Sequence, residues 1–453
     1  MTTSIRPDER KILQFLYEKQ ALHPLQALAA ESLAQQMGIP WNDLRYQIDR
    51  LHEEEFLVLK ARQIRARIFY TLYLTAKGQN LVEASATPPP PSVKYHNFDL
   101  HLLPTTIGLR IEVLNSPAGE AVTETPLPAA VTEFAHYVFE QEADVQPDRP
   151  GSHPTPMSLA AIGDQIGQLL LSGAVRDCFK TCMGMLANRK EDGLRIRLRI
   201  YDHQLAAIPW ELARIDGEYL CLRLKTSLVR YIPTSEPPGS LRTDGALRIL
   251  GIISNPTDLQ PLNVNTEQKV LAQALAPLTG EQTGAKKVEL TWLTESSVQH
   301  LQDALRQSYH VLHFVGHGDY DEARDEAHLV FTNEKQESVL VSSQWLAALL
   351  RDSSVRFIFL NSCASGKSAR SIAGELVRRG VAAALGIQSD IRDEVAIALT
   401  YGFYKALSDR LPVDAALVEA RKSLLSISAS ELASPEWVQP ILYMRSPDGY
   451  LFS

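Results

Sequence analysis

Residues 311–319 read VLHFVGHGD, and residues 357–366 read FIFLNSCASG. Each stretch begins as a short apolar run, which predicts a buried strand. The first then reaches His317 between two glycines, and the second reaches Cys363 followed by small residues. Further apolar runs, separated by helical patterns, occupy residues 247–254, 288–293 and 382–387. This alternation predicts an α/β fold with a largely parallel sheet sandwiched by helices.

Reactive groups in such sheets gather at the carboxyl ends of the strands, which is where His317 and Cys363 are expected. A thiol becomes a strong nucleophile as its thiolate, so it needs a neighbouring base. Glycines beside the histidine let a substrate backbone come close, and they free the Gly318 N–H to face a reacting carbonyl. Small residues after Cys363 keep the approach to its sulfur open and let its own N–H act as a second donor. A cysteine at a strand end is, taken alone, more often a packing residue.

Together the two stretches resemble the paired histidine and cysteine motifs of CHAT domains, which are relatives of caspases, separases and metacaspases. The separation of His317 and Cys363 is close to the ~50 residues that caspases show. Other parts of the family are resembled by IPWEL at 208–212, GVAAALG at 380–386, FYKAL at 403–407 and EW at 436–437. The resemblance covers roughly residues 95–453.

The resemblance implies a caspase-like fold and peptide-bond hydrolysis by a cysteine endopeptidase. By analogy His317 is the general base and acid, Cys363 is the nucleophile, and the N–H groups of Gly318 and Cys363 hold the oxyanion. A dyad suffices in this group of enzymes, so no cofactor and no metal is expected. His313 matches an earlier histidine of the motif. Because it lies inside the predicted strand, a packing or hydrogen-bonding role is expected for it.

The substrate pocket is less clearly indicated. Metacaspases often have an acid two residues before the cysteine, which helps to receive a basic side chain, and that position here is Asn361. Asp390 and Asp393 follow the next predicted strand. They either line the pocket with Asn361 or are solvated loop acids and helix caps. A preference for arginine or lysine at the cleavage site therefore stays open.

Two other patterns in the same region carry expectations. The acidic segment at residues 319–326, directly after the histidine, is a candidate mobile loop or else a solvated turn. Residues 194–200 read LRIRLRI, and this strict alternation predicts a half-buried strand.

Four consecutive prolines at residues 88–91 mark a boundary, because they continue neither a helix nor a central strand. The predicted organisation is a first domain, a proline-rich linker, and the two halves of the CHAT domain, of which the second is catalytic. These occupy residues 1–86, 87–94, 95–240 and 241–453.

Residues 1–86 show three amphipathic helical patterns followed by two strand patterns, an order that resembles a small winged helix-turn-helix domain. Basic residues that would contact DNA or a partner are Arg45, Lys60, Arg62, Arg65 and Arg67. The third helical pattern also contains Asp43 and Asp49 and ends in three glutamates at 53–55, which would repel a duplex. Protein docking or regulation is therefore favoured over DNA binding, and a purely structural cap is the remaining alternative.

Composition sets the broad class. Of 453 residues, 45% are hydrophobic and 22% charged, which is typical of a globular protein, and the net charge of -8 argues against general coating of nucleic acid. Cys178, Cys182 and Cys221 complete a sparse set of four cysteines that does not predict a disulfide framework, and they are expected to be packing residues. The first residues lack the pattern of a signal peptide, and no apolar run is long enough to span a membrane. A cytoplasmic location is expected.

CHAT domains fused to sensing modules resemble regulated effectors of bacterial stress, cell-death or phage-defence systems. The resemblance thus implies a protein substrate and an activating protein or ligand. The alternative is a non-catalytic winged-helix regulator or adaptor that uses the caspase-like domain as a binding scaffold.

Overall fold

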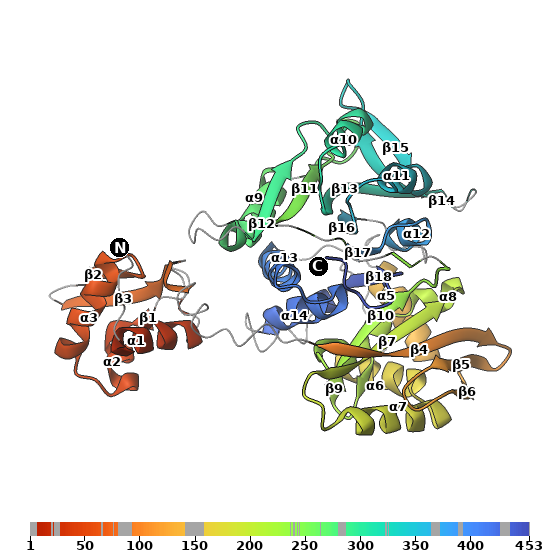
Figure 1. Cartoon of the computed structure of the whole chain (residues 1–453), viewed down its shortest axis with the longest axis horizontal. Helices are drawn as coiled ribbons and strands as arrows, with labels where there is room; N and C mark the ends of the chain where they lie inside the picture. Colours follow the sequence, from red (N-terminus) through yellow and green to blue (C-terminus); the bar gives the residue numbers. More distant parts are fainter. Residues whose placement is uncertain are drawn as a thin grey trace, which may run out of the picture. The chain divides into compact units, whose positions relative to one another are not determined.

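The structure is a computed structural model of the whole chain, and its Cα positions form two compact units (Figure 1). One unit comprises residues 1–90 with 277–286, and the other comprises residues 91–276 with 287–453. The residues that the structure describes are 7–19, 21, 28–64, 67–75, 77–79, 93–140, 158–235, 237–238, 241, 243, 245–262, 264–279, 287–321, 324, 326–363, 372–387, 393–425 and 435–452. None of the helices in these ranges has the length and hydropathy of a membrane span.

The first unit packs helices against a small antiparallel sheet. Its elements are α1 (Pro7–Glu18), β1 (Leu28–Ala29), α2 (Ala30–Met37), α3 (Trp41–Glu53), β2 (Leu57–Ile64) and β3 (Arg67–Leu74). The strands lie in the order β1-β3-β2. Gly38 ends α2 in the left-handed region at a φ of 65°, where its N–H bonds to carbonyls of the last turn. Leu44, Ile48 and Leu51 bury one face of α3, as the predicted amphipathic pattern requires.

One continuous sheet organises the second unit. Its strands are β4 (Lys94–Thr105), β5 (Gly108–Asn115), β6 (Ala121–Thr125), β7 (Asp192–Ile200), β10 (Thr226–Tyr231), β11 (Leu247–Ile253), β12 (Val288–Trp292), β13 (Val311–Asp321), β14 (Glu326–Thr332), β15 (Ser338–Ser342), β16 (Phe357–Cys363), β17 (Ala383–Ile387) and β18 (Pro440–Met444). The main path is β12-β11-β13-β16-β17-β18-β10-β7-β4-β5-β6, and β14 and β15 extend from β13. A separate short hairpin is formed by β8 (Arg214–Ile215) and β9 (Glu218–Tyr219).

The sheet is parallel from β12 to β17 and again from β18 through β10 and β7 to β4. Between these runs, β17 and β18 pair antiparallel, so the two runs point in opposite directions. The β4–β5–β6 meander and the β13–β14–β15 extension are antiparallel too. The predicted largely parallel sheet is confirmed, and it passes through both predicted halves of the domain.

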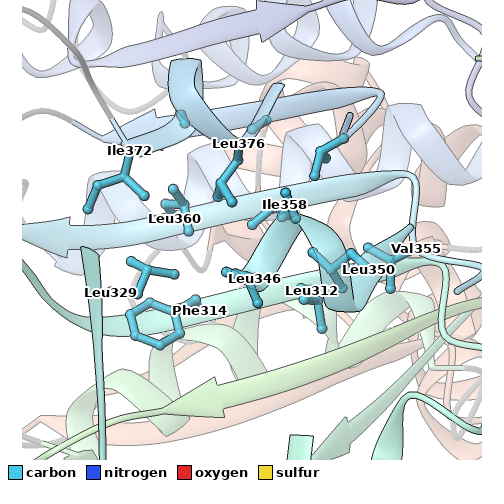
Figure 2. Packing of buried hydrophobic residues seen from close by; sticks show 14 of the residues in the cluster. Leu312, Phe314, Leu329, Leu346, Leu350, Val355, Ile358, Leu360, Ile372 and Leu376 are labelled. Carbon is cyan, nitrogen blue, oxygen red and sulfur yellow. The ribbon is translucent and has the colours of Figure 1, made fainter. Parts of the chain in front are cut away.

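Helices cover both faces of this sheet. They are α5 (Ala129–Glu140), α6 (Leu159–Leu170), α7 (Gly173–Leu186), α8 (His203–Ala207), α9 (Val264–Leu275), α10 (Val298–Ala304), α11 (Ser343–Leu350), α12 (Ile372–Arg378), α13 (Asp393–Ser408) and α14 (Val413–Leu425). On one face, Phe314 of β13 and Leu360 of β16 pack with Leu346 of α11 and Leu376 of α12 (Figure 2). On the other, the ring of Phe403 in α13 stacks on that of Phe357, with centroids 5.1 Å apart. The strands β13 and β16 are therefore buried on both sides.

The predicted half-buried strand at 194–200 is covered on both faces instead. Arg195 and Arg197 of β7 are buried, and their guanidinium groups bind the carboxylates of Asp414 and Asp99. These carboxylates belong to α14 and β4, so the arginines became core residues through partners far away in the sequence. The alternation of side-chain type was read correctly, but the solvent exposure inferred from it was wrong.

Candidate active site

The candidate site lies where the adjacent parallel strands β13 and β16 end. Their register begins with Val311 opposite Phe357 and runs without interruption to His317 opposite Cys363. Neighbouring strands of a sheet lie about 4.8 Å apart, so the backbones of His317 and Cys363 lie side by side. The register thus places the two backbone positions next to each other where these strands end, and a dyad of their side chains stays a prediction.

The imidazole of His317 is held by a backbone carbonyl. Its Nε2 lies 2.9 Å from the carbonyl oxygen of Gln260, in the segment that follows β11. A carbonyl oxygen only accepts, so Nε2 carries the hydrogen in this contact. In the neutral ring the basic nitrogen is then Nδ1. This contact sets both the orientation of the ring and the nitrogen that is available to take up a proton.

His313 lies four residues before His317 on the same strand, β13, but its surroundings are different. It is buried, its Nδ1 lies 2.9 Å from the Tyr404 hydroxyl, and its ring stacks on Phe359 with centroids 4.5 Å apart. Burial lowers the pKa of His313 to about 3. A neutral, hydrogen-bonded core histidine is the result, and the predicted packing role is confirmed.

Gly316 is required by packing. A Cβ at this position would lie 2.7 Å from the ring of Phe314 and 3.2 Å from the Cβ of Ser254. Access for a substrate was the reason inferred from the sequence, but the crowding comes from the protein's own core. Gly318 stands opposite Leu329 of β14 and is partly exposed.

Replacing Gly316 by alanine is expected to destabilise the second unit by about 1–3 kcal/mol, because the Phe314 ring must move in a filled core. Gly184 in α7 is a matched control, since nothing lies within 4 Å of its added Cβ. There alanine should be neutral or stabilising. Urea unfolding combined with hydrogen exchange in β13 peptides measures both changes, and equal effects at the two positions would refute the crowding explanation.

The acidic segment after the histidine forms part of a hairpin. Asp319 and Asp321 continue β13, Glu326 begins β14, and Asp321 stands opposite Glu326 in register. Arg324 in the turn makes an ion pair with Asp321 at 3.4 Å. The expectation of a loop is therefore wrong for the strand residues, while residues 322, 323 and 325 lie outside the described part of the chain.

The predicted pocket residues are only partly placed. Asn361 stands opposite Val315, is partly exposed, and lies two residues before Cys363 on the same strand. Asp390 lies outside the described residues. Asp393 begins α13, and the surroundings of its carboxylate are not described. Whether these three residues form one pocket remains a prediction.

The IPWEL motif builds a buried support at some distance along the chain. Trp210 is fully buried, and its indole N–H donates to the Leu205 carbonyl at 2.8 Å. Glu211 is buried as well and accepts two hydrogen bonds from the guanidinium of Arg230, at 3.1 and 3.0 Å. The motif therefore has a structural role that accounts for its residue types.

The other cysteines are packing residues or partly exposed. Cys182 and Cys221 are buried, as predicted. The Cys221 thiol donates to the Glu211 carbonyl at 2.9 Å, and burial raises the pKa of Cys221 to about 11, which keeps this thiol unreactive. Cys178 is partly exposed on α7, with its Sγ 3.3 Å from the Ser116 hydroxyl. Across the described ranges, no three residues of the His, Cys, Asp and Glu types are grouped so as to hold a metal ion.

In the first unit, the basic residues singled out from the sequence are differently placed. The guanidinium of Arg45 makes an ion pair with Asp49 at 3.3 Å and lies 4.3 Å from the ring centroid of Tyr70. Hydrogen bonding to Tyr70 raises the pKa of Arg45. Lys60 is exposed on β2, with its Nζ 5.6 Å from the Tyr73 ring. Arg62 belongs to β2 and Arg67 to β3, but only their backbones are described. Arg65 lies outside the described residues.

Comparison with known proteins points to one family. A model of the CHAT domain matches residues 162–443, more than half of the chain. No curated protein matches significantly.

Among solved structures, separase in the Saccharomyces cerevisiae separase–securin complex is 14% identical to this chain, with a TM-score of 0.34. The match covers 60% of this chain and 17% of separase. The Arg-specific cysteine proteinase gingipain R is 11% identical with a TM-score of 0.38, over 64% of this chain and 70% of its own. The Porphyromonas gingivalis RgpB complex of pro- and mature domains gives the same identity and TM-score, over 64% and 72%. The chain thus spans about a sixth of the length of the separase that it matches.

Proposed function

The chain belongs to the CHAT domain family, and from that premise we propose that it is a cysteine endopeptidase in which His317 and Cys363 form the catalytic dyad. The observation that carries the proposal is the register of β13 and β16, which sets these two residues opposite each other at the edge of the sheet. The hydrogen bond from His317 Nε2 to the Gln260 carbonyl supports it, because it leaves Nδ1 as the base.

In the proposed reaction, the Cys363 thiol loses its proton to Nδ1 of His317 and its sulfur attacks the carbonyl carbon of the scissile peptide bond. The N–H groups of Gly318 and Cys363 stabilise the negative charge that develops on the carbonyl oxygen. His317 returns the proton to the leaving amine, and a thioester remains on Cys363. Water, deprotonated by His317, then releases the acid product and restores the thiol.

The biological role we propose is that of a regulated effector in a bacterial stress, cell-death or phage-defence system that acts in the cytoplasm on a protein partner. The first unit has the helix and strand order of a winged helix, which supports a sensing or docking role. Tyr46 of α3 is 64% exposed, whereas Arg45 beside it is engaged by Asp49 and Tyr70. An exposed aromatic with an occupied arginine favours a protein contact over phosphate binding.

Terminal-peptide proteomics tests the proposal. Cells that carry the native neighbouring genes express the intact chain, the Cys363→Ala variant, or Cys178→Ser as a control for thiol loss elsewhere. We expect new peptide ends with the intact chain and with Cys178→Ser, and none with Cys363→Ala. The sequences at these ends also reveal the residue preference of the pocket.

Identical peptide ends with and without the Cys363 thiol would contradict the peptidase proposal. If partner proteins were still retained by both forms, a binding scaffold would then explain the chain better. If the intact chain and the Cys363→Ala variant bound a specific DNA sequence equally well, a winged-helix regulator would be favoured.

A further inference from the structure

The segment that supplies the Gln260 carbonyl is tied at its start and its end. The N–H of Ser254, where the segment leaves β11, donates to the Val315 carbonyl at 2.8 Å. The N–H of Leu262 donates to the Asn255 side-chain carbonyl at 2.7 Å. Between these points, residues 257–261 are exposed. Exposed backbone opens locally at a low free-energy cost, so the Gln260 carbonyl stays in place only when the middle of the segment is tied too, on the side opposite Leu262.

That middle tie comes from the turn between β14 and β15. The backbone N–H and the hydroxyl of Thr257 both donate to the Gln336 carbonyl, at 2.8 and 3.0 Å. The Asp258 carboxylate accepts from both the N–H and the hydroxyl of Ser338, each at 2.8 Å. Hydrogen bonding from the Ser338 hydroxyl lowers the pKa of Asp258, so the carboxylate is the form that makes these bonds.

The turn itself is well defined. The side-chain carbonyl of Asn333 accepts from the N–H groups of Lys335 and Glu337, at 2.8 and 2.9 Å. Gln336 adopts a left-handed φ of 61°, which turns the chain back into β15. The turn is therefore organised by bonds of its own and offers Asp258 a fixed anchor.

We infer that Asp258 is a positioning residue for His317, acting through the Gln260 carbonyl two residues further on, and that the β14–β15 turn is thereby part of the active site. The inference rests on the proposed function, since it assigns His317 a catalytic task. Without the Asp258 bonds, the backbone between Thr257 and Leu262 is no longer tied, so the Gln260 carbonyl loses its fixed position and the imidazole loses the bond that orients it. Catalytic groups tolerate displacements of only about 0.5 Å before rates fall.

Alkylation of Cys363 by iodoacetamide, followed as a function of pH by peptide mass spectrometry, tests this without a known substrate. The full chain carries Cys178→Ser, because Cys178 is partly exposed whereas Cys182 and Cys221 are buried. At pH 6.5 we expect Cys363 of this parent to react at least about tenfold faster than in its His317→Ala variant, because His317 favours the thiolate. Asp258→Ala should lose most of this advantage and fall to within about threefold of His317→Ala.

Two variants separate positioning from general damage. Asp258→Asn offers a carbonyl to the Ser338 N–H and an amide to its hydroxyl, so its pH profile should match the parent. Thr257→Val removes one of two bonds to the same carbonyl and should match the parent too. Because Asp258 is exposed, the urea midpoint of the second unit should change little in all three.

The outcomes are distinct. A parent-like profile for Asp258→Ala, while His317→Ala differs, would overturn the positioning inference and leave the dyad standing. Equal losses in Asp258→Ala and Asp258→Asn would overturn it in favour of a charge effect. A parent-like profile for His317→Ala would refute the dyad itself, and the positioning inference with it.

Discussion

Replacing His317 by alanine is expected to lower the rate of peptide cleavage by about four to six orders of magnitude. In the proposed mechanism its imidazole takes the proton from the Cys363 thiol and delivers it to the leaving amine, so both steps lose their catalyst. The substrate for this assay is a peptide spanning a cleavage site found by terminal proteomics, and the initial rate is the quantity measured.

In the proposed mechanism the two residues act as one unit, so the double variant His317→Ala/Cys363→Ala should be no slower than the worse single variant. His300 is a suitable control, because it is a partly exposed histidine of α10 bonded to Ser297 and belongs to the same unit. His300→Ala should leave the rate unchanged. A loss of less than about tenfold in His317→Ala would contradict the assignment of the base.

Replacing Asp414 by alanine is expected to destabilise the second unit by about 3–5 kcal/mol. Its carboxylate is wholly buried and accepts hydrogen bonds from Arg195 Nε at 2.8 Å, Arg195 Nη2 at 3.0 Å and the Ser227 hydroxyl at 2.6 Å. Removing it leaves the guanidinium of Arg195 buried without its counter-charge. The pair joins β7 to α14, so its loss acts on the whole sheet and leaves the chemistry of the site untouched.

Urea unfolding with hydrogen exchange in β7 and α14 peptides measures this change in the second unit alone. Asp409→Ala is the matched control, because Asp409 forms a partly exposed ion pair with Lys287 at 2.5 Å. That pair should contribute only about 0–1 kcal/mol. If both variants lowered the free energy of unfolding by similar amounts, burial would not explain how much the Arg195–Asp414 pair contributes to stability.

The sequence predicts best what depends on local pattern. The apolar runs at 311–315 and 357–360 became β13 and β16, and the histidine at 313 was correctly separated from the one at 317 by its position inside the strand. Residue type and strand-end placement made His317 and Cys363 candidates, and the resemblance to CHAT domains joined them in the predicted dyad. Their register, however, is a property of two strands and could be seen only in the folded sheet.

The features that the sequence does not reveal depend on distant partners or on the backbone. In the sequence, the alternating arginines of β7 are typical of a solvent-exposed face. Only the folded structure shows that Asp414 and Asp99 pair with Arg195 and Arg197 in the core. The Gln260 carbonyl has no signature, since every residue has such a group. Asp258 lies four residues after the end of the strand predicted at 247–254, which is a weak signal for a site residue. Its partner Ser338 cannot be predicted from the spacing of the two residues in the sequence. The sequence drew attention to Gly316, but the crowding by the Phe314 ring that requires a glycine there could be seen only in the structure.

The most direct test of the central claim is to map the residue that reacts with a substrate-like electrophile. The full chain is treated with peptidyl acyloxymethyl ketones that differ in the residue next to the ketone, then digested and analysed by mass spectrometry. The proposed dyad predicts a thioether on Cys363, dependent on the peptide sequence, strongly reduced in His317→Ala and absent from Cys178. An adduct on another residue, or equal labelling of Cys363 with and without His317, would contradict it.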